Sequence, residues 1–235
     1  QQGLHQSQMF GDTHAEARLY LWLGILYQQQ SQLAQAYNHL QQSATSFASV
    51  GDTAHQAKAL NRLAYVARLQ RSYTASQHAV DQALTLLAND DAERSFSYFV
   101  KGVIAFDHGD WANAVEQFQR SIQWIEPLGD QRTLARRLRN LGPALRALGR
   151  YDEAIACYTR AIALFEAVYD PVQQAVTRMN LGVVYLMSEQ PTQALAQFTP
   201  AEPVFREVHD RLHLAMLQTN QGIAYRLLQE WAQAE

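Results

Sequence analysis

Apolar residues recur along this chain at spacings of three and four, and the whole pattern returns about every 40 residues. A small residue marks each recurrence, and a large apolar residue follows sixteen positions later. The small residues are Gly24, Ala64, Gly102, Gly142, Gly182 and Gly222, and the large ones are Leu40, Val80, Phe118, Tyr158 and Phe198. Because small residues let two helix backbones approach closely, each unit is predicted to be a pair of packed helices.

Aspartates mark where the first helix of each unit begins. They stand twelve residues before each small residue, at Asp12, Asp52, Asp90, Asp130, Asp170 and Asp210. A carboxylate there can accept hydrogen bonds from the free N–H groups of a first helical turn. The first helices are therefore expected to begin near Thr13, Thr53, Asp91, Gln131, Pro171 and Arg211. Gly11, Gly51, Asn89 and Gly129 precede four of the aspartates and tolerate the left-handed conformation that ends a helix.

Three irregularities interrupt this pattern. Pro143 lies inside a first helix, where a kink is expected because proline lacks an N–H donor. Pro200 and Pro203 lie inside a second helix, which is expected to bend or break. The step from Ala64 to Gly102 is 38 residues, and we place the shortening near 87–90.

The chain resembles the tetratricopeptide repeat family at these recurring positions. The matching residues are Leu141, Gly142, Tyr151, Ala154, Tyr158 and Ala161, and again Leu181, Gly182, Tyr185, Ala194, Phe198 and Ala201. The resemblance implies an all-α fold, a right-handed α-solenoid of stacked antiparallel helix pairs, with first helices lining a concave groove. The repeat is longer than the 34-residue form. It looks like the repeats of kinesin light chains, of spindle-orientation adaptors and of bacterial signalling proteins that carry such arrays beside ATPase, protease or DNA-binding domains.

We expect one solenoid over residues 1–235. Its full repeats are 11–50, 51–89, 90–129, 130–169 and 170–209, flanked by partial repeats at 1–10 and 210–235. Residues 1–10 fit the tail of a preceding second helix, with Leu4 and Phe10 as its apolar positions, and Glu230 is expected to begin an unfinished one. Repeat arrays need polar caps, which both ends lack, so we expect an excised part of a longer protein. Self-association through the open ends is a possible consequence.

Composition narrows the function classes. The 235 residues are 48% hydrophobic and 17% charged with a net charge of −3, which argues against disorder and against a nucleic-acid surface. No apolar run approaches the length of a membrane span. One cysteine, Cys157, cannot form a disulfide within the chain, and a cytoplasmic location is expected.

Arginines concentrate on the first helix of the fourth repeat. Residues 131–150 include six arginines and no acidic residue. The resemblance places four of them on groove positions: Arg132, Arg136, Arg139 and Arg146. Their planar donor forks suit carboxylates, which predicts a site for an acidic peptide or a C-terminal carboxylate. The alternative is a solvated face that pairs with acids of neighbouring repeats, such as Glu93, Glu126, Asp152 and Glu153.

Two further groups fall near the same groove. Asn140, Asn180 and Asn220 each stand two residues before the glycine, where an amide can grip an extended peptide backbone or tie one first helix to the next. Phe96, Phe99 and Phe106 are expected to form an aromatic part of the groove, although packing between repeats is the alternative.

Catalysis and metal binding find little support. The chain has no phosphate-binding glycine loop, no nucleophile arrangement and no cysteine pair, so we expect neither an enzyme nor a cofactor. His209 and His213 flank Asp210 at helical spacing, which is more often incidental than a metal site. We therefore predict a non-catalytic scaffold that binds a protein or peptide segment, and the arginines favour an acidic one. The alternative is a ligand-sensing or self-assembly arm of a bacterial signalling protein whose effector domain lies elsewhere.

Overall fold

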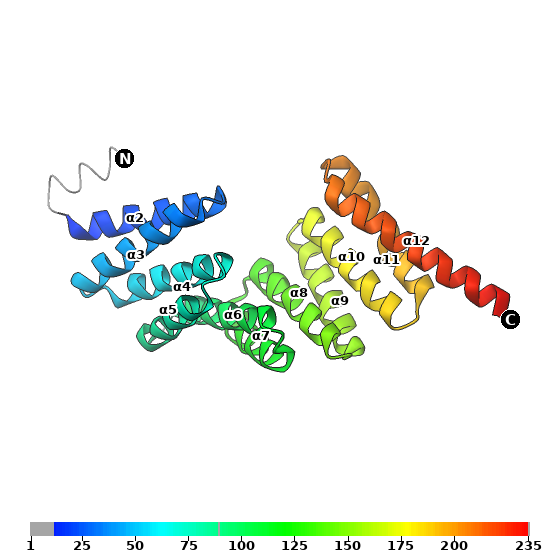
Figure 1. Cartoon of the computed structure of the whole chain (residues 1–235), viewed down its shortest axis with the longest axis horizontal. Helices are drawn as coiled ribbons and strands as arrows, with labels where there is room; N and C mark the ends of the chain where they lie inside the picture. The colour runs from blue at the N-terminus through cyan, green and yellow to red at the C-terminus, as the bar shows by residue number, and fades with distance from the viewer. Residues whose placement is uncertain (1–11, 89, 235) are drawn as a thin grey trace. The chain divides into compact units, whose positions relative to one another are not determined.

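The computed structural model describes residues 12–88 and 90–234, and within them the chain is helical with no strand (Figure 1). The α-helices are α2 (Thr13–Gln29), α3 (Leu33–Ser49), α4 (Thr53–Leu69), α5 (Tyr73–Leu86), α6 (Asp91–Asp107), α7 (Trp111–Ile125), α8 (Gln131–Ala147), α9 (Tyr151–Ala167), α10 (Pro171–Met187), α11 (Pro191–Glu207) and α12 (Arg211–Ala234). A 3₁₀ turn, η1 (Glu126–Leu128), follows α7. The contacts divide the chain into two compact units, Gln1–Trp124 and Ile125–Glu235, each described here by itself.

The predicted helix starts are confirmed. α2, α4, α6, α8, α10 and α12 begin at the six expected residues. In each case the preceding aspartate accepts a hydrogen bond from the backbone N–H three residues later, at 2.9–3.3 Å. The repeat therefore starts with the same N-cap every time, because one carboxylate satisfies a donor that the helix cannot.

Left-handed residues form the turns of the repeat. Within each helix pair the turn residue with positive φ is Ser31, Arg71, Gly109, Gly149 or Glu189. Between pairs it is Gly51, Gly129, Tyr169 or His209. This confirms the role expected for Gly51 and Gly129, whereas Gly11 and Asn89 lie outside the described residues.

Close packing of the small residue against the second helix holds each pair together. A methyl group added at Gly142 would lie 2.2 Å from a ring carbon of Tyr158, and one added at Gly182 would lie 2.2 Å from Phe198. Both rings are fully buried, at 1% and 0% exposure. Ala64 is the exception among the small residues, and the buried Val80 takes the place of the ring there.

The prolines do not interrupt their helices. α11 is continuous through Pro200 and Pro203, so the expected break is wrong, whereas the bend expected as the alternative stays a prediction. Both prolines are on the exposed side of α11, where carbonyl groups that lose a partner reach water. Phe198, Ala201 and Phe205 are fully buried on the opposite side, and their packing maintains the helix. α8 likewise continues through Pro143, and a kink there stays a prediction.

Two other expectations concern helix length. The shortening between the second and third units is confirmed, because α5 has 14 residues where α3 has 17, and it ends in extended backbone at Leu87. The second helix expected to begin at Glu230 is wrong, since α12 runs without a turn to Ala234. In the fifth unit the left-handed residue Glu189 forms the turn between the two helices of the pair. Gln229, one repeat later, is helical, so no turn forms there.

Leu4 and Phe10 lie outside the described residues. None of the described helices combines the length and the apolar character needed to cross a membrane, the 24-residue α12 included.

Candidate functional site

The arginine stripe of α8 lies against α10 in the second unit. Arg132 donates to a carboxylate oxygen of Asp170 at 3.1 Å and to the carbonyl of Val168 at 3.3 Å. Arg139 donates to the amide oxygen of Gln173. Since these arginines are seven residues apart on one helix, they occupy one side of α8 and bridge it to the next first helix.

Arg146 continues this seam one step further along α8. Its guanidinium approaches the sulfur of Met187 at 3.4 Å. Thioether sulfur is a weak acceptor, so this contact leaves most of the charge of Arg146 unneutralised.

Arg139 is partly withdrawn from solvent. Its guanidinium carbon lies 5.8 Å from the ring centroid of Phe165. Burial, followed by the nearby charge of Arg136, lowers the pKa of Arg139. The side chain is therefore a component of the α8–α10 seam, and its role there is structural as well as electrostatic.

Arg136 differs from the other three arginines of the stripe. It is exposed, and it forms no ion pair with any residue in the described part of the chain. The acids named as alternative partners are engaged elsewhere or not at all: Glu126 pairs with Arg160, and Glu153 pairs with Arg150 at 2.6 Å. Pairing with an acid of the next repeat thus describes Arg132 but not Arg136.

The three asparagines predicted for the groove differ in their hydrogen bonds, and none of them ties one first helix to the next within the described residues. Asn140 donates to the carbonyl of Arg136 in its own helix, at 2.7 Å. Asn180 and Asn220 are half-buried, and their side chains form no hydrogen bond within the described residues. Asn61, one position out of register, is buried and bonded to Glu93 and Ser97 of the next first helix, as the structural alternative predicts.

The aromatic residues belong to the first unit and are less exposed than expected. Phe99 is only 9% exposed and packs between Tyr65, Phe96 and Phe118, with ring centroids 5.9–6.3 Å apart, so the expectation that it forms a groove surface is wrong. Its position faces the second helix of its own pair. Phe96 and Phe106 are half-buried, Phe96 beneath the guanidinium of Arg62 at 4.2 Å and Phe106 against Trp111 at 4.8 Å.

Comparisons with known proteins agree with this repeat. Two family models described as tetratricopeptide repeat match residues 93–167 and 139–201. The matched segments contain the capped helix pairs with their glycine and aromatic positions. Residues 93–201 of the chain belong to the tetratricopeptide repeat family.

Solved structures of similar fold include several repeat proteins. The apo form of RapI has a TM-score of 0.79 at 18% identity, over 92% of this chain and 81% of that one. A Rap protein complexed with competence and sporulation factor has a TM-score of 0.73 at 18% identity, over 93% and 64%. A signal transduction ATPase with numerous domains from Pyrococcus horikoshii, which carries a tetratricopeptide repeat sensor, has a TM-score of 0.81 at 14% identity, over 89% and 32%. We found no significant sequence match among curated proteins.

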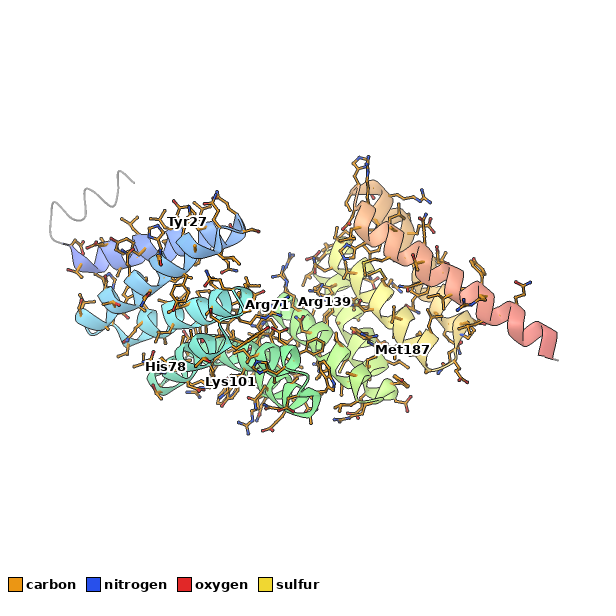
Figure 2. The ribbon with its side chains drawn as sticks, in the orientation of Figure 1. Tyr27, Arg71, His78, Lys101, Arg139 and Met187 are labelled. Atoms are coloured by element: carbon orange, nitrogen blue, oxygen red, sulfur yellow. The ribbon has the colours of Figure 1, made fainter. Side chains whose placement is uncertain are left out.

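This tetratricopeptide repeat protein folds as an α-solenoid of stacked helix pairs. Proteins of this kind are protein-interaction scaffolds. Sequence reasoning missed one hollow in the first unit. A polar cleft of about 1110 Å³ lies among α5, α6 and α7 and is lined by Arg71, His78 and Lys101, among others (Figure 2). The available signal was Lys101, a charged residue where most repeats have leucine before the glycine; its ammonium pairs with Asp81 at 2.8 Å.

Cys157 and the two histidines beside Asp210 have structural surroundings. Burial, together with the charge of Glu153, raises the pKa of the Cys157 thiol to about 11, so little of the reactive thiolate forms at neutral pH. Nδ1 of His213 donates to a carboxylate oxygen of Asp210 at 2.7 Å, and its ring stacks on Phe205. His209 is the left-handed turn residue before that cap.

Proposed function

We propose that this tetratricopeptide repeat protein is a non-catalytic scaffold that binds an acidic peptide segment along α8 and α10. The observation that carries the proposal is Arg136, an exposed guanidinium with no acidic partner in the described part of the chain. It stands beside a helix seam that already uses the neighbouring arginines, so its charge is available to a carboxylate from outside.

The neighbouring groups suit an extended peptide. Arg146 adds a second guanidinium whose contact within the chain is a thioether. Asn180, on the adjacent α10, is half-buried with an amide that can donate and accept one hydrogen bond each. Two guanidinium forks supply attraction to carboxylates, and the amide supplies a contact to the peptide backbone that does not depend on sequence.

Arg132 and Arg139 contribute differently from what their sequence positions suggest. They bridge α8 to Asp170 and Gln173, and this fixes the spacing of the two helices that the peptide would follow. We therefore assign ligand contact to Arg136, Arg146 and Asn180, and positioning to Arg132 and Arg139.

The test is calorimetric titration with an acidic peptide and a neutral peptide of equal length. Arg136→Glu should weaken acidic-peptide binding, and the double variant with Arg146→Glu should abolish it, while thermal unfolding stays near that of the wild type. Asn180→Ala should weaken the binding of both the acidic and the neutral peptide. Binding of the acidic peptide should fall with added salt, because exposed charges are screened over about 10 Å at 0.1 M ionic strength.

Arg211→Glu is the matched control. It makes the same charge change at an exposed site at the start of α12, where the side chain has no ion pair within the described residues. Equal loss of binding in Arg136→Glu and Arg211→Glu would reduce the effect to net charge. Concentration-dependent association of the chain with itself, without peptide binding, would favour the self-assembly alternative.

A further inference from the structure

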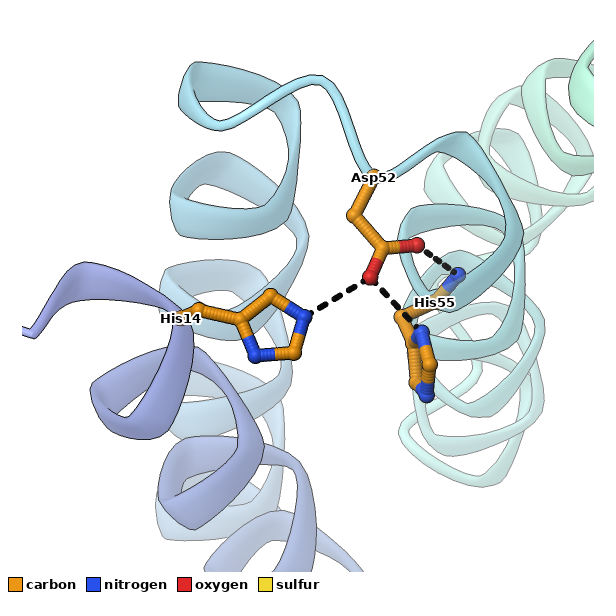
Figure 3. A group of neighbouring side chains, drawn as sticks. All are labelled: His14, Asp52 and His55. Atoms are coloured by element: carbon orange, nitrogen blue, oxygen red, sulfur yellow. Dashed lines mark hydrogen bonds and ion pairs between the residues drawn. The ribbon is translucent and has the colours of Figure 1, made fainter.

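Two histidines from successive repeats converge on one carboxylate at the start of the first unit. Nε2 of His14, in the first turn of α2, lies 2.9 Å from Oδ2 of Asp52. Nδ1 of His55, in the first turn of α4, lies 2.8 Å from the same oxygen. The three ligand atoms all lie within 4.8 Å of one another (Figure 3).

Apart from the two imidazoles, the contacts of this cluster involve the other carboxylate oxygen of Asp52. Oδ1 of Asp52 accepts the backbone N–H of His55 at 3.0 Å and so caps α4, while Oδ2 faces the two imidazoles. The fully buried Phe47 holds both rings, with centroids 5.6 Å from His14 and 5.1 Å from His55. In the other neutral tautomer each of these nitrogens carries a lone pair in place of its N–H proton, so two nitrogens and one oxygen within 4.8 Å of one another become available as ligands.

We propose that His14, Asp52 and His55 form a site for a divalent transition metal ion, Zn²⁺ being the best match. Two imidazoles and one carboxylate are ligands that Zn²⁺ takes at about 2.0–2.2 Å, with water completing a four-coordinate shell. Bonds of that length need the two imidazoles to move closer together. They have room to do so, since both side chains are nearly half exposed, at 46% and 45%.

The charge of the carboxylate favours the same ion. At neutral pH Asp52 is an ionised carboxylate, and its Oδ1 accepts the backbone N–H of His55 at 3.0 Å. The ligand set therefore carries one full negative charge near the N-termini of α2 and α4, whose dipoles would otherwise repel a cation.

The repeat itself supplies comparison sites, because the same three positions recur with other residues. In the last pair of repeats Asp210 and His213 keep the geometry, with a 2.7 Å contact and His213 stacked on Phe205, but Val172 stands where the first site has His14. In another, Arg132 takes that place against Asp170, and its permanent charge repels a metal. Of these three sites, only the first combines two histidines with the aspartate.

The experiment is Zn²⁺ titration of tag-free chain at pH 7.5, where free imidazole is neutral and able to ligate. We expect one ion per chain. His14→Ala and His55→Ala should each weaken binding by at least about 10-fold, the loss that follows removal even of an outer partner of a metal ligand. Asp52→Asn should do the same while keeping the cap of α4, because asparagine caps as well as aspartate.

Two variants of the last repeats separate a built site from scattered histidines. His213→Ala should leave Zn²⁺ affinity unchanged, and Val172→His should add a second ion per chain. Circular dichroism in EDTA checks that every variant remains folded. The proposal is overturned if the wild type binds no Zn²⁺, if His14→Ala and His55→Ala bind as the wild type does, or if the folded Val172→His gains no ion.

Discussion

At the scale of single residues, four of the five helix pairs from α2 to α11 depend on one glycine facing one large side chain. The distance from an added Cβ to that side chain is 2.2 Å at Gly182 and 2.7 Å at Gly102, well inside van der Waals contact. Gly222 faces nothing within 4 Å. A glycine in the same register is therefore required at Gly182 and replaceable at Gly222, and the neighbouring helix makes the difference.

Gly182→Ala is expected to destabilise the protein by about 1–3 kcal/mol, because the buried Phe198 cannot move away from the added methyl group without overpacking the core. Gly222→Ala is the control and should stabilise by about 0.5–1 kcal/mol, the helix-propensity difference alone. Urea unfolding measures both. Combining Gly182→Ala with Phe198→Val should recover part of the loss; equal effects of the two alanine substitutions would contradict the packing argument.

Sequence alone predicts which residues carry charge, but not what they face. The spacing of Arg132 and Arg139 placed them on one helix side, yet their partners Asp170 and Gln173 come from a helix 34–38 residues later, whose side-chain positions depend on packing. The groove position predicted for Phe99 was wrong for the same reason, because its burial depends on rings from other helices. The convergence of His14 on Asp52 was readable in principle, from a histidine two residues past one cap and an aspartate at the next.

At the scale of helices, the capping aspartates set where each repeat begins, and this was predictable because capping is local chemistry. The three-residue distance between aspartate and bonded N–H is a property of the helix, independent of its neighbours. Continuity through a proline is not local. Pro200 removes a donor, but buried residues on the opposite side of α11 decide whether the helix survives, and the sequence does not state that balance.

The capping aspartates should make the free energy of unfolding depend on pH. Hydrogen bonds from the Thr133 hydroxyl and backbone N–H hold the pKa of Asp130 below its usual range. Since the folded pKa is the lower one, the stabilisation is complete above the unfolded pKa of about 3.9 and disappears as the pH falls through the folded value. Asp130→Asn keeps the acceptor without the charge, so its stability difference from the wild type should vanish in acid.

Urea unfolding between about pH 3 and pH 7 measures that difference. Asp152→Asn is the control: it removes the same charge from a first helical turn, where the side chain has no hydrogen bond or ion pair within the described residues. The argument fails if the two variants show the same pH dependence.

At the scale of the whole molecule, stability arises from neighbouring repeats. In the second unit, Ala175, Met179, Phe198, Phe205 and Leu217 form one buried cluster from α10, α11 and α12. A repeat array is stabilised by each unit and by its contacts with the next, so a segment with its own core can fold without the rest.

The segment 125–235 expressed alone should therefore be helical and should unfold cooperatively in urea, with a smaller denaturant dependence than the full chain because less surface becomes exposed. Circular dichroism against urea checks this. The segment 1–124 serves as the counterpart. A non-cooperative, largely unfolded segment 125–235 would show that its core needs the first unit.

The pairing of Ala64 with Val80, beside four glycines that face larger side chains, has a consequence for how duplicated repeats diverge. Single substitutions must pass through a folded intermediate. Shrinking the large residue first leaves a cavity, which weakens the repeat but keeps its helices in place. Adding the methyl group first puts a Cβ 2.2 Å from a ring in repeats such as that of Gly142, so that intermediate has an overpacked core. The two orders of mutation therefore pass through different intermediates, one with a cavity and one with an overpacked core.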